Sequence, residues 1–390
     1  MANKINISKH FLLFVALFFV TFTSFAYEPI DAEKHENVAE PKEQGEKAHE
    51  ESTTFDAGKM ILEHVADSHD WHMWGEGEHS VSIPLPIIIY SDKGFDVFSS
   101  AQFHHGHASF LGKYNYRLHE GSLVVFDDIT GTVDEEATSK LTDFSVTKNV
   151  ASMLVTMLLM LWVFITVAKA YKNNQGKAPR GLQSFVEPLI IFVRDDVAKP
   201  SIGDKRYEKF MPFLLTVFFF IMFSNYLGLI PVFPGGVNLT GSISIAMVLA
   251  GFTLLITFVV ANKHYWRHVF AMPGVPIPVL IILTPIEILG VFLRPFVLMI
   301  RLFANITAGH IIALAFFSLI FIFGEMNTGL GFGVSIFSLV FTVFMGFLEL
   351  LVAFLQAYVF TLLSAIYFGS AIDEGHDVHN HVDDHALEKH

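Results

Sequence analysis

Long apolar stretches recur from about residue 147 onward, between short polar segments. Each contains more than about 18 residues with almost no charge, close to the ~20 that a helix needs to cross the hydrocarbon layer of a membrane. The predicted membrane-spanning helices cover residues 147–169, 210–231, 241–261, 277–323 and 334–372. The pattern therefore predicts an all-α polytopic membrane protein with a membrane domain over residues 144–372.

The segment before the first span, residues 27–143, has a different pattern and is acidic and rich in histidine. Its beginning, "EKHENVAEPKEQGEKAHEESTTFD", has low hydrophobicity and is predicted to be disordered. The later stretches "HSVSIPLPIIIYS" and "GSLVVFDDITGTV" are typical of short strands separated by Gly and Asp turns. We expect a small, partly disordered domain.

The first residues, 1–26, have the pattern of a secretory signal peptide. Two lysines precede an apolar stretch at 11–23, and Ser24 and Ala26 supply small residues for cleavage. The alternative is an uncleaved first span, but the apolar stretch is shorter than the ~20 residues a span requires. Cleavage is the favoured interpretation, and it makes residues 27–143 an exported region.

The loops between spans differ in basic charge, and this difference predicts the orientation. Lys and Arg are concentrated in 170–209 and 262–270, whereas 232–240 and 324–333 contain neither. Basic loops mark the cytoplasmic side of a membrane. The N-terminal region is therefore expected outside, and the acidic, histidine-rich tail, 373–390, in the cytoplasm.

One predicted span is too long for an upright helix. A helix over 277–323 measures about 70 Å at ~1.5 Å per residue, against a hydrocarbon layer of ~30 Å. Tilts of up to ~40° do not absorb the difference. Two spans would invert the later topology and conflict with the basic loops. The sequence favours one strongly inclined helix that forms a hairpin with 334–372, which is also overlong.

Net charge and cysteine content exclude some classes of partner and metal site. The net charge is −13 and no domain is basic, so nucleic acid is an unfavourable partner. The chain has no cysteine, which excludes disulfides and thiolate metal sites. Weak metal candidates are His104, His105 and His107 in "HHGH", but solvated polar surface is the default interpretation. We assign no metal and no cofactor.

Polar residues inside the final hairpin occur at matched depths. The turn centres near residue 329, so Arg301 lies level with Gln356, and His310 level with Glu349. An imidazole beside a carboxylate can pass a proton through a polar cavity. The alternative is a hydrogen bond that only fixes two helices together.

Helical spacing also predicts which of these residues share a face. Residues advance by about 100°, so Glu287, Arg294, Arg301 and Asn305 lie on one face, whereas His310 points the opposite way. Glu287 and Arg294 could instead reach the interface with their long side chains. Arg301 is always charged and costs at least ~2.5–3.5 kcal/mol at membrane depth. No carboxylate lies at its depth, so we expect an anion from another molecule.

These residues resemble the a subunit of F-type ATP synthases. "RLFANITAGH", residues 301–310, matches the family's R-L-F-x-N motif, and "FLQAYVFTLLSAIYF" carries its Gln-Ala motif on the last helix. Further matches are "FSNYLGLIP", "GVNLTGSISIAM" and "PIEILGVFLRP". The similarity covers roughly residues 145–372.

The resemblance implies a proton-conducting stator subunit, a non-catalytic part of the complex in the bacterial inner membrane. Its partners would be c-ring subunits, peripheral-stalk b subunits and the lipid bilayer. Arg301 would face the c ring and separate two half-channels, with Gln356 and Asn305 beside it. His310 and Glu349 would form an acid–imidazole pair in swapped order. Residues with further matches to the family are Glu287 on the ion pathway, and Asn225 and Asn238 in supporting positions.

The sequence also bears on two rival functions. A metal-ion transporter would use the histidine-rich exported region, but the predicted membrane-spanning stretches hold one histidine, His310, where coordinating clusters are needed. An anion transporter would hold its substrate with Arg301, but the sequence shows no internal repeat of the kind such transporters contain. The long exported region and the histidine-rich tail are departures from many family members.

Overall fold

The computed structural model describes most of the chain in two separate units. The described residues are 58, 66–74, 81–106, 109–119, 121–127, 132–173, 178–230, 233–272, 275–326 and 328–373. The predictions for 1–26, for the low-hydrophobicity segment and for the tail after Asp373 lie outside these residues. One unit comprises residues 1–148 and 309–347, and the other 149–308 and 348–390.

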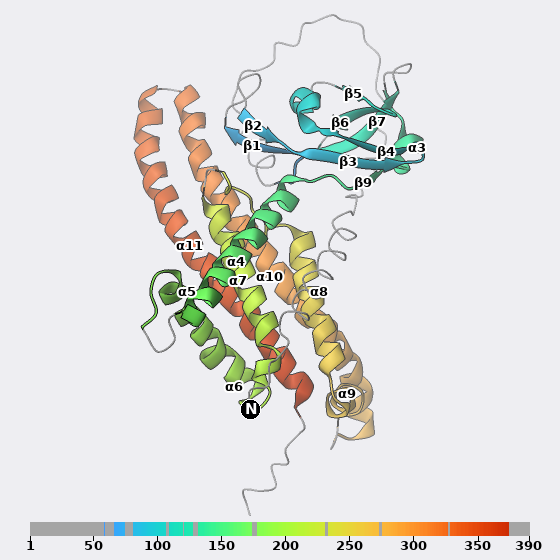
Figure 1. Cartoon of the computed structure of the whole chain (residues 1–390), viewed down its shortest axis with the longest axis vertical. Helices are drawn as coiled ribbons and strands as arrows, with labels where there is room; N and C mark the ends of the chain where they lie inside the picture. The colour runs from blue at the N-terminus through green and yellow to red at the C-terminus, as the bar shows by residue number, and fades with distance from the viewer. Residues whose placement is uncertain are drawn as a thin grey trace, which may run out of the picture. The chain divides into compact units, whose positions relative to one another are not determined.

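The N-terminal described residues form a β region (residues 66–147, Figure 1). β1 (Asp70–Trp74) pairs with β2 (Val81–Pro84). A second sheet has the order β4 (Gly94–Ser99), β3 (Pro86–Ser91), β9 (Thr142–Asp143). The third contains β5 (Ser109–Leu111), β6 (Asn115–His119), β7 (Ser122–Asp127) and β8 (Thr132–Val133). The two stretches predicted to contain strands therefore do.

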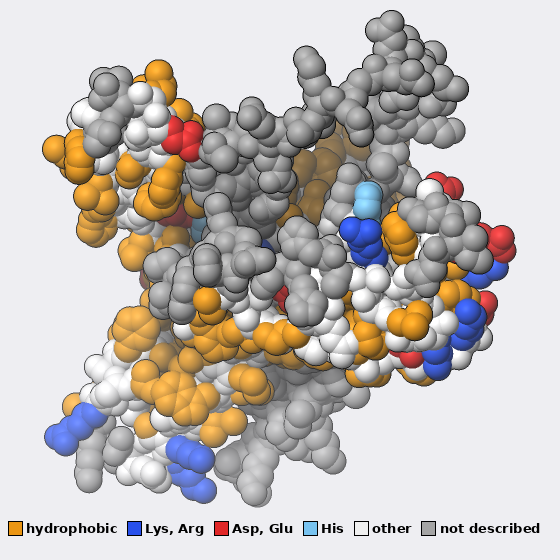
Figure 2. Space-filling view, turned by 90° about the horizontal axis from the view of Figure 1, so that it is seen from above, with side chains coloured by type: hydrophobic (Ala, Val, Ile, Leu, Met, Phe, Trp, Pro, Cys, Tyr) orange, Lys and Arg blue, Asp and Glu red, His pale blue; other side chains and the backbone are white. Residues whose placement is uncertain are grey.

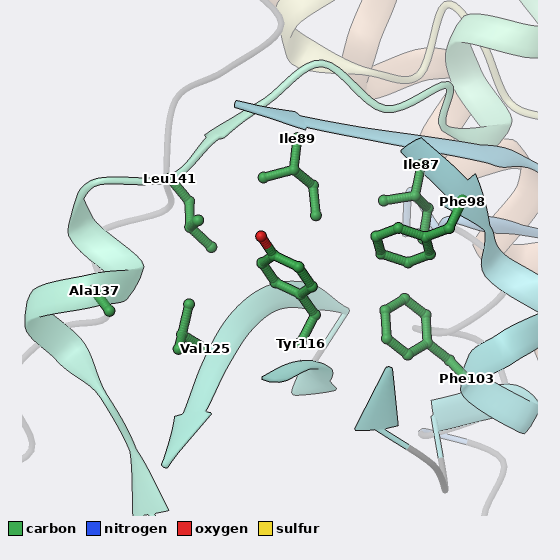
Figure 3. Packing of buried hydrophobic residues seen from close by; sticks show 8 residues of the cluster. All are labelled: Ile87, Ile89, Phe98, Phe103, Tyr116, Val125, Ala137 and Leu141. Atoms are coloured by element: carbon green, nitrogen blue, oxygen red, sulfur yellow. The ribbon is translucent and has the colours of Figure 1, made fainter. Parts of the chain in front are cut away.

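The β region has its own hydrophobic core. Alternation along β3 points Ile87 and Ile89 inward, where both are fully buried. They pack with side chains from the short helix after β4 (Ser100–Gly106), from the third sheet and from α3 (Glu135–Ser139), as Figure 3 shows. The buried hydroxyl of Tyr116 donates to Asp96 Oδ2 at 2.8 Å, so this core contains no unsatisfied phenol. Burial and this hydrogen bond raise the pKa of Tyr116.

A hydrogen bond from the buried His69 connects the start of the β region to its end. His69 Nε2 donates to Asp143 Oδ2 at 3.1 Å, and the Lys148 amide donates to Ser68 O at 2.8 Å. Burial alone would raise the pKa of Asp143, but hydrogen bonds from His69 and Ser145 outweigh it and lower the pKa. Asp143 therefore stabilises the fold above its ordinary pKa of 3.8. This stabilisation is lost as the pH falls through the lower folded value.

Asp143→Asn should loosen this connection. A hydrogen bond to a charged group contributes about 1.5–3 kcal/mol, so exchange of the Lys148 amide should accelerate about tenfold or more at neutral pH. Hydrogen–deuterium exchange of the assembled protein measures this rate. The exposed Glu135→Gln is the matched control and should leave it unchanged. Equal rates in wild type and Asp143→Asn at neutral pH would contradict the role of Asp143.

The membrane domain contains all five predicted spans. Among the described residues, the helices long and apolar enough to cross a membrane are α4 (Lys148–Asn173), α7 (Met211–Leu229), α8 (Ile243–Val260), α10 (Ile277–Met326) and α11 (Thr328–Ile372). Hydrophobic side chains make up much of the visible surface in Figure 2. Exposed Leu, Ile, Val and Phe side chains are numerous on α4, α10 and α11, as expected for helices in contact with lipid.

The overlong span is one helix, as predicted. α10 has 50 residues without a break, about 75 Å at ~1.5 Å per residue, although it contains Pro285 and Pro295. The alternative of two separate spans is therefore wrong. α11 is similarly long, with 45 residues. Near the tip of this hairpin, the Phe316 and Phe341 rings lie 4.0 Å apart, centroid to centroid.

Shorter helices join the spans. The amphipathic segment after α4 forms α5 (Leu182–Phe192), a π-helical turn at Val193–Ala198 and α6 (Lys199–Ile202). A 3₁₀ turn at Tyr207–Lys209 precedes α7, and α9 (Lys263–Phe270) follows α8. Backbone amides in these connections donate to nearby carbonyls, for example Gly203 to Lys199 O at 2.8 Å and Phe210 to Tyr207 O at 3.0 Å.

The last half of α11 is the centre of the second unit. Its buried positions recur every three or four residues, at Ala353, Ala357, Phe360, Ser364 and Phe368. Aromatic contacts join it to α5 and α7, and Thr253 of α8 lies 3.3 Å from Ser364, hydroxyl to hydroxyl. Small residues along this stripe allow neighbouring helices to approach closely.

Gly369 sits at the tightest of these approaches. A Cβ atom there would lie 1.9 Å from the backbone oxygen of Ser201 at the end of α6. Gly369→Ala should therefore destabilise the domain by about 1–3 kcal/mol, the usual cost of overpacking. Gly290→Ala on α10 is the control, because its Cβ would meet nothing within 4 Å.

The amount of folded protein recovered from membranes after graded heating would measure this difference. Equal thermal loss for Gly369→Ala and Gly290→Ala would contradict the close approach of α6 to α11.

Candidate ion-translocation site

Arg301 lies on the exposed surface of α10. It flanks a buried stripe formed by Val291, Leu298, Leu302 and Ile306. No ion pair connects Arg301 to any other residue that the structure describes. A guanidinium on an otherwise apolar helix surface is therefore left without a counter-charge from the described part of this chain.

The other members of the predicted polar face differ in burial. Asn305 is exposed, whereas Glu287 and Arg294 are half-buried. The Arg294 guanidinium carbon lies 5.9 Å from the ring centroid of Tyr367 on α11, a cation–π distance. Arg294 thus has a structural contact within the chain, whereas Arg301 has no such aromatic contact among the described residues.

Gln356 and Glu349 occupy the buried stripe of α11. Their exposed fractions are only 7% and 9%, and Ala353 lies between them on the same face. No hydrogen bond joins Arg301 to Gln356 among the described residues, so their predicted proximity stays a prediction. His310 is half-buried on α10. Its pairing with Glu349 also stays a prediction.

A buried polar layer surrounds Asn225 near the end of α7. Asn225 Nδ2 donates to Ala353 O at 3.1 Å, and its Oδ1 accepts a short hydrogen bond from Thr240. Asn225 and Thr240 are 5% and 1% exposed. One asparagine thereby connects α7, the loop before α8 and the polar face of α11, one turn from Glu349.

Asn238 organises the same loop. Its Oδ1 accepts from the Gly241 amide at 2.9 Å, and Thr307 of α10 donates to Gly241 O at 3.2 Å. Glycine at 241 leaves room for the Asn238 side chain, because a Cβ there would lie 2.1 Å from Asn238 Nδ2 and would displace it. The loop between α7 and α8 is therefore fastened to α10, six residues beyond Arg301.

Two atoms in this layer are buried without a hydrogen bond from the described residues. They are Ser224 Oγ, beside Asn225, and Asn238 Nδ2. The sequence pointed to Asn225 and Asn238 but not to Ser224, Thr240 or Thr307. Small hydroxyl residues are common in apolar helices, so only the three-dimensional contacts select these three.

The described residues show no group of three or more His, Cys, Asp or Glu side chains placed to hold a metal ion. The side chains of His104, His105 and His107 lie outside the described residues. The site has a fixed cation, Arg301, on the exposed face of α10. α11 supplies a buried carboxylate and a buried amide, and the asparagine and hydroxyl groups of the polar layer lie one turn from that carboxylate.

The fold and the site define a class: a multi-pass helical membrane protein with an exposed arginine on a long apolar helix and buried polar groups on other spans. A family model described as "ATP synthase A chain" matches residues 150–369, more than half of the chain. The chain belongs to this family and is a proton-translocating membrane-sector subunit of an F-type ATP synthase. A second model, "Domain of unknown function (DUF8433)", matches residues 60–144 of the N-terminal region.

Curated relatives agree with this assignment. The chain is 40% identical to ATP synthase subunit a of Chloroherpeton thalassium over 250 residues, which cover 62% of this chain and 72% of that protein. It is 44% identical to ATP synthase subunit a 2 of Chlorobaculum tepidum, covering 61% and 66%. A relative from Anaeromyxobacter dehalogenans, also an ATP synthase subunit a, is 31% identical over 91% of this chain and 86% of its own.

Proposed function

We propose that Arg301 couples ion flow through this subunit to rotation of a ring of c subunits. The observation that carries the proposal is its exposure on an apolar helix face with no counter-charge among the described residues. A carboxylate on a passing ring subunit would supply the missing anion. The attraction lowers the affinity of that carboxylate for a proton, so the proton is released as the carboxylate meets Arg301.

Two half-channels on opposite sides of Arg301 complete the mechanism. On the outer side, protons enter past His310 and Glu349 and protonate a ring carboxylate, which then turns into lipid as a neutral group. The polar layer of Asn225, Thr240 and Asn238 supports this route, because it supplies hydrogen-bonding groups beside Glu349 in an otherwise apolar bundle. After nearly a full turn the proton leaves past Arg301 into the cytoplasm.

The fixed charge of Arg301 also blocks a direct leak between the half-channels. A proton crossing without the ring would have to pass a cation in a low-dielectric setting. Each charge that crosses 100 mV supplies about 2.3 kcal/mol, and only the route through the ring converts this energy into rotation. Gln356 and Asn305 are polar neighbours of the contact, and Glu287 lies further along α10 toward the cytoplasmic exit.

The same proposal covers topology and partners. Residues 1–26 are a cleaved signal peptide, 27–143 are exported, 144–372 form the membrane domain, and 373–390 face the cytoplasm of a bacterium. The inclination of α10 and α11 lets a long hairpin follow the ring surface, since helices of this length exceed the ~30 Å hydrocarbon layer. Peripheral-stalk b subunits bind elsewhere on the domain and hold it still.

Arg301→Ala should abolish ATP-driven proton pumping while the subunit still assembles. The reason is that Arg294, the other described cation on this face, is half-buried and contacts Tyr367, so it is not free to discharge the ring carboxylate. Pumping is measured in inverted membrane vesicles by quenching of a pH-sensitive dye, with the amount of assembled complex measured in parallel. Ile300→Ala, on an exposed apolar neighbour, is the control and should pump normally. Wild-type pumping by Arg301→Ala would reject the role.

Glu349→Gln should slow proton translocation by about 100-fold, the lower range for loss of a proton-transferring group, with a smaller effect on assembly. The double variant His310→Glu with Glu349→His restores an acid and an imidazole and should recover part of the rate. If the double variant were no faster than Glu349→Gln, or if only assembly suffered, the two residues would have a structural role instead.

A further inference from the structure

α9 is held rigidly against the end of α11. Its side chains Tyr265 and Val269 are buried against Val291 of α10 and Ala371 of α11. Asn262 caps α9 by accepting from the Tyr265 amide at 2.8 Å. Because these contacts fix one face of α9, the opposite face has a defined position relative to the point where α11 ends.

That opposite face is cationic. It consists of the exposed side chains Lys263, His264, Arg267 and His268, which form two pairs with the i, i+4 spacing of one helix side. α9 itself contains no acidic residue, and no ion pair joins Lys263 or Arg267 to another described residue. We call these four residues the α9 basic face.

The chain leaves α11 directly beside this face. Asn262, the residue before Lys263, donates from its amide to Ala371 O at 3.0 Å and from Nδ2 to Asp373 O at 2.7 Å. Arg206, from the loop before α7, donates to Ile372 O at 2.8 Å. Asn262, at the start of α9, and Arg206, in the loop before α7, thus cap the last carbonyls of α11. The chain continues from Asp373 next to these two residues.

The residues that follow have the complementary charge. Between 374 and 390 there are five carboxylates and one lysine. The carboxylates are Glu374, Asp377, Asp383, Asp384 and Glu388. Extended chain spans about 3.3 Å per residue, whereas α9 is only about 12 Å long, so a few residues suffice to reach along its whole face.

We propose that the acidic tail, residues 374–390, docks on the α9 basic face. Single exposed ion pairs contribute little. The tail, however, is tethered next to the face, so its effective concentration is high and several weak pairs form together. The docked tail covers the cationic face and joins the ends of α8 and α11. A competing occupant is an anionic lipid headgroup, but the tail has its attachment at the face itself.

Carbodiimide cross-linking of the complete ATP synthase in its membrane tests the docking. This reagent joins an amine to a carboxylate that it touches, and mass spectrometry identifies the pair. We expect Lys263 to be linked to tail carboxylates, including Asp383 or Asp384. About 0.5 M KCl should reduce the yield roughly tenfold, because salt screens exposed charges.

Two variants separate docking from mere proximity. Arg267→Gln keeps the reactive amine of Lys263 but removes a neighbouring charge, and it should reduce the cross-link about tenfold. Lys172→Gln, on the exposed end of α4, is the matched control and should leave the yield unchanged. If the yield were insensitive to both salt and Arg267→Gln, the links would report chance encounters and the proposal would fail.

Reconstitution of the complex into vesicles of defined lipid distinguishes docking of the tail from binding of an anionic lipid headgroup. The complex is placed in vesicles of phosphatidylcholine alone or with phosphatidylglycerol. The proposal expects the cross-links in both. If phosphatidylglycerol abolished the links to Lys263, the headgroup would be the occupant of the α9 basic face and the proposal would be wrong.

Discussion

The central physical problem of this subunit is a permanent positive charge on the apolar surface of a long helix. Arg301 cannot lose its charge, and it is exposed on α10 among apolar side chains. Membrane proteins tolerate such a group only when another charge or a polar cavity compensates for it. The described residues of this chain supply no carboxylate within ion-pair distance of Arg301, and the counter-charge that we propose is a carboxylate of the c ring.

The remaining fold can be understood as a scaffold that positions this charge. α11 is packed on several sides by α5, α6, α7 and α8 through a stripe of small residues and phenylalanines. Thr307, Gly241 and Asn238 tie α10 to the loop before α8, and Asn225 ties α7 to α11. The polar layer that joins the helices also lies one turn from Glu349, so the residues that fix the helices are the ones that we propose to line the proton path.

Most of the membrane fold could be predicted from the sequence because hydrophobic length is a local property. The five spans begin and end within a few residues of the predicted limits, and the length of α10 alone indicated an unusual helix. The strands of the β region followed from alternating apolar residues such as Ile87 and Ile89. The common face of Glu349 and Gln356 was also predictable from their seven-residue spacing, since both lie on the buried side of α11.

What the sequence could not give depends on contacts between distant segments. The cation–π contact of Arg294 with Tyr367 and the bonds of Thr240 and Thr307 join residues far apart in the chain, and no local pattern marks them. The caps of Asn262 and Arg206 on the end of α11 are similar cases. Whether Arg301 meets a ring carboxylate depends on a second protein and is not encoded in this chain at all.

The most direct test is a high-resolution map of the intact membrane sector, in which the partner of the Arg301 guanidinium is identified. We predict that a carboxylate of a ring subunit lies within about 4–6 Å of this guanidinium, the range in which opposite charges shift protonation. A guanidinium turned toward bulk water, or neutralised by an acid of its own subunit, would contradict it.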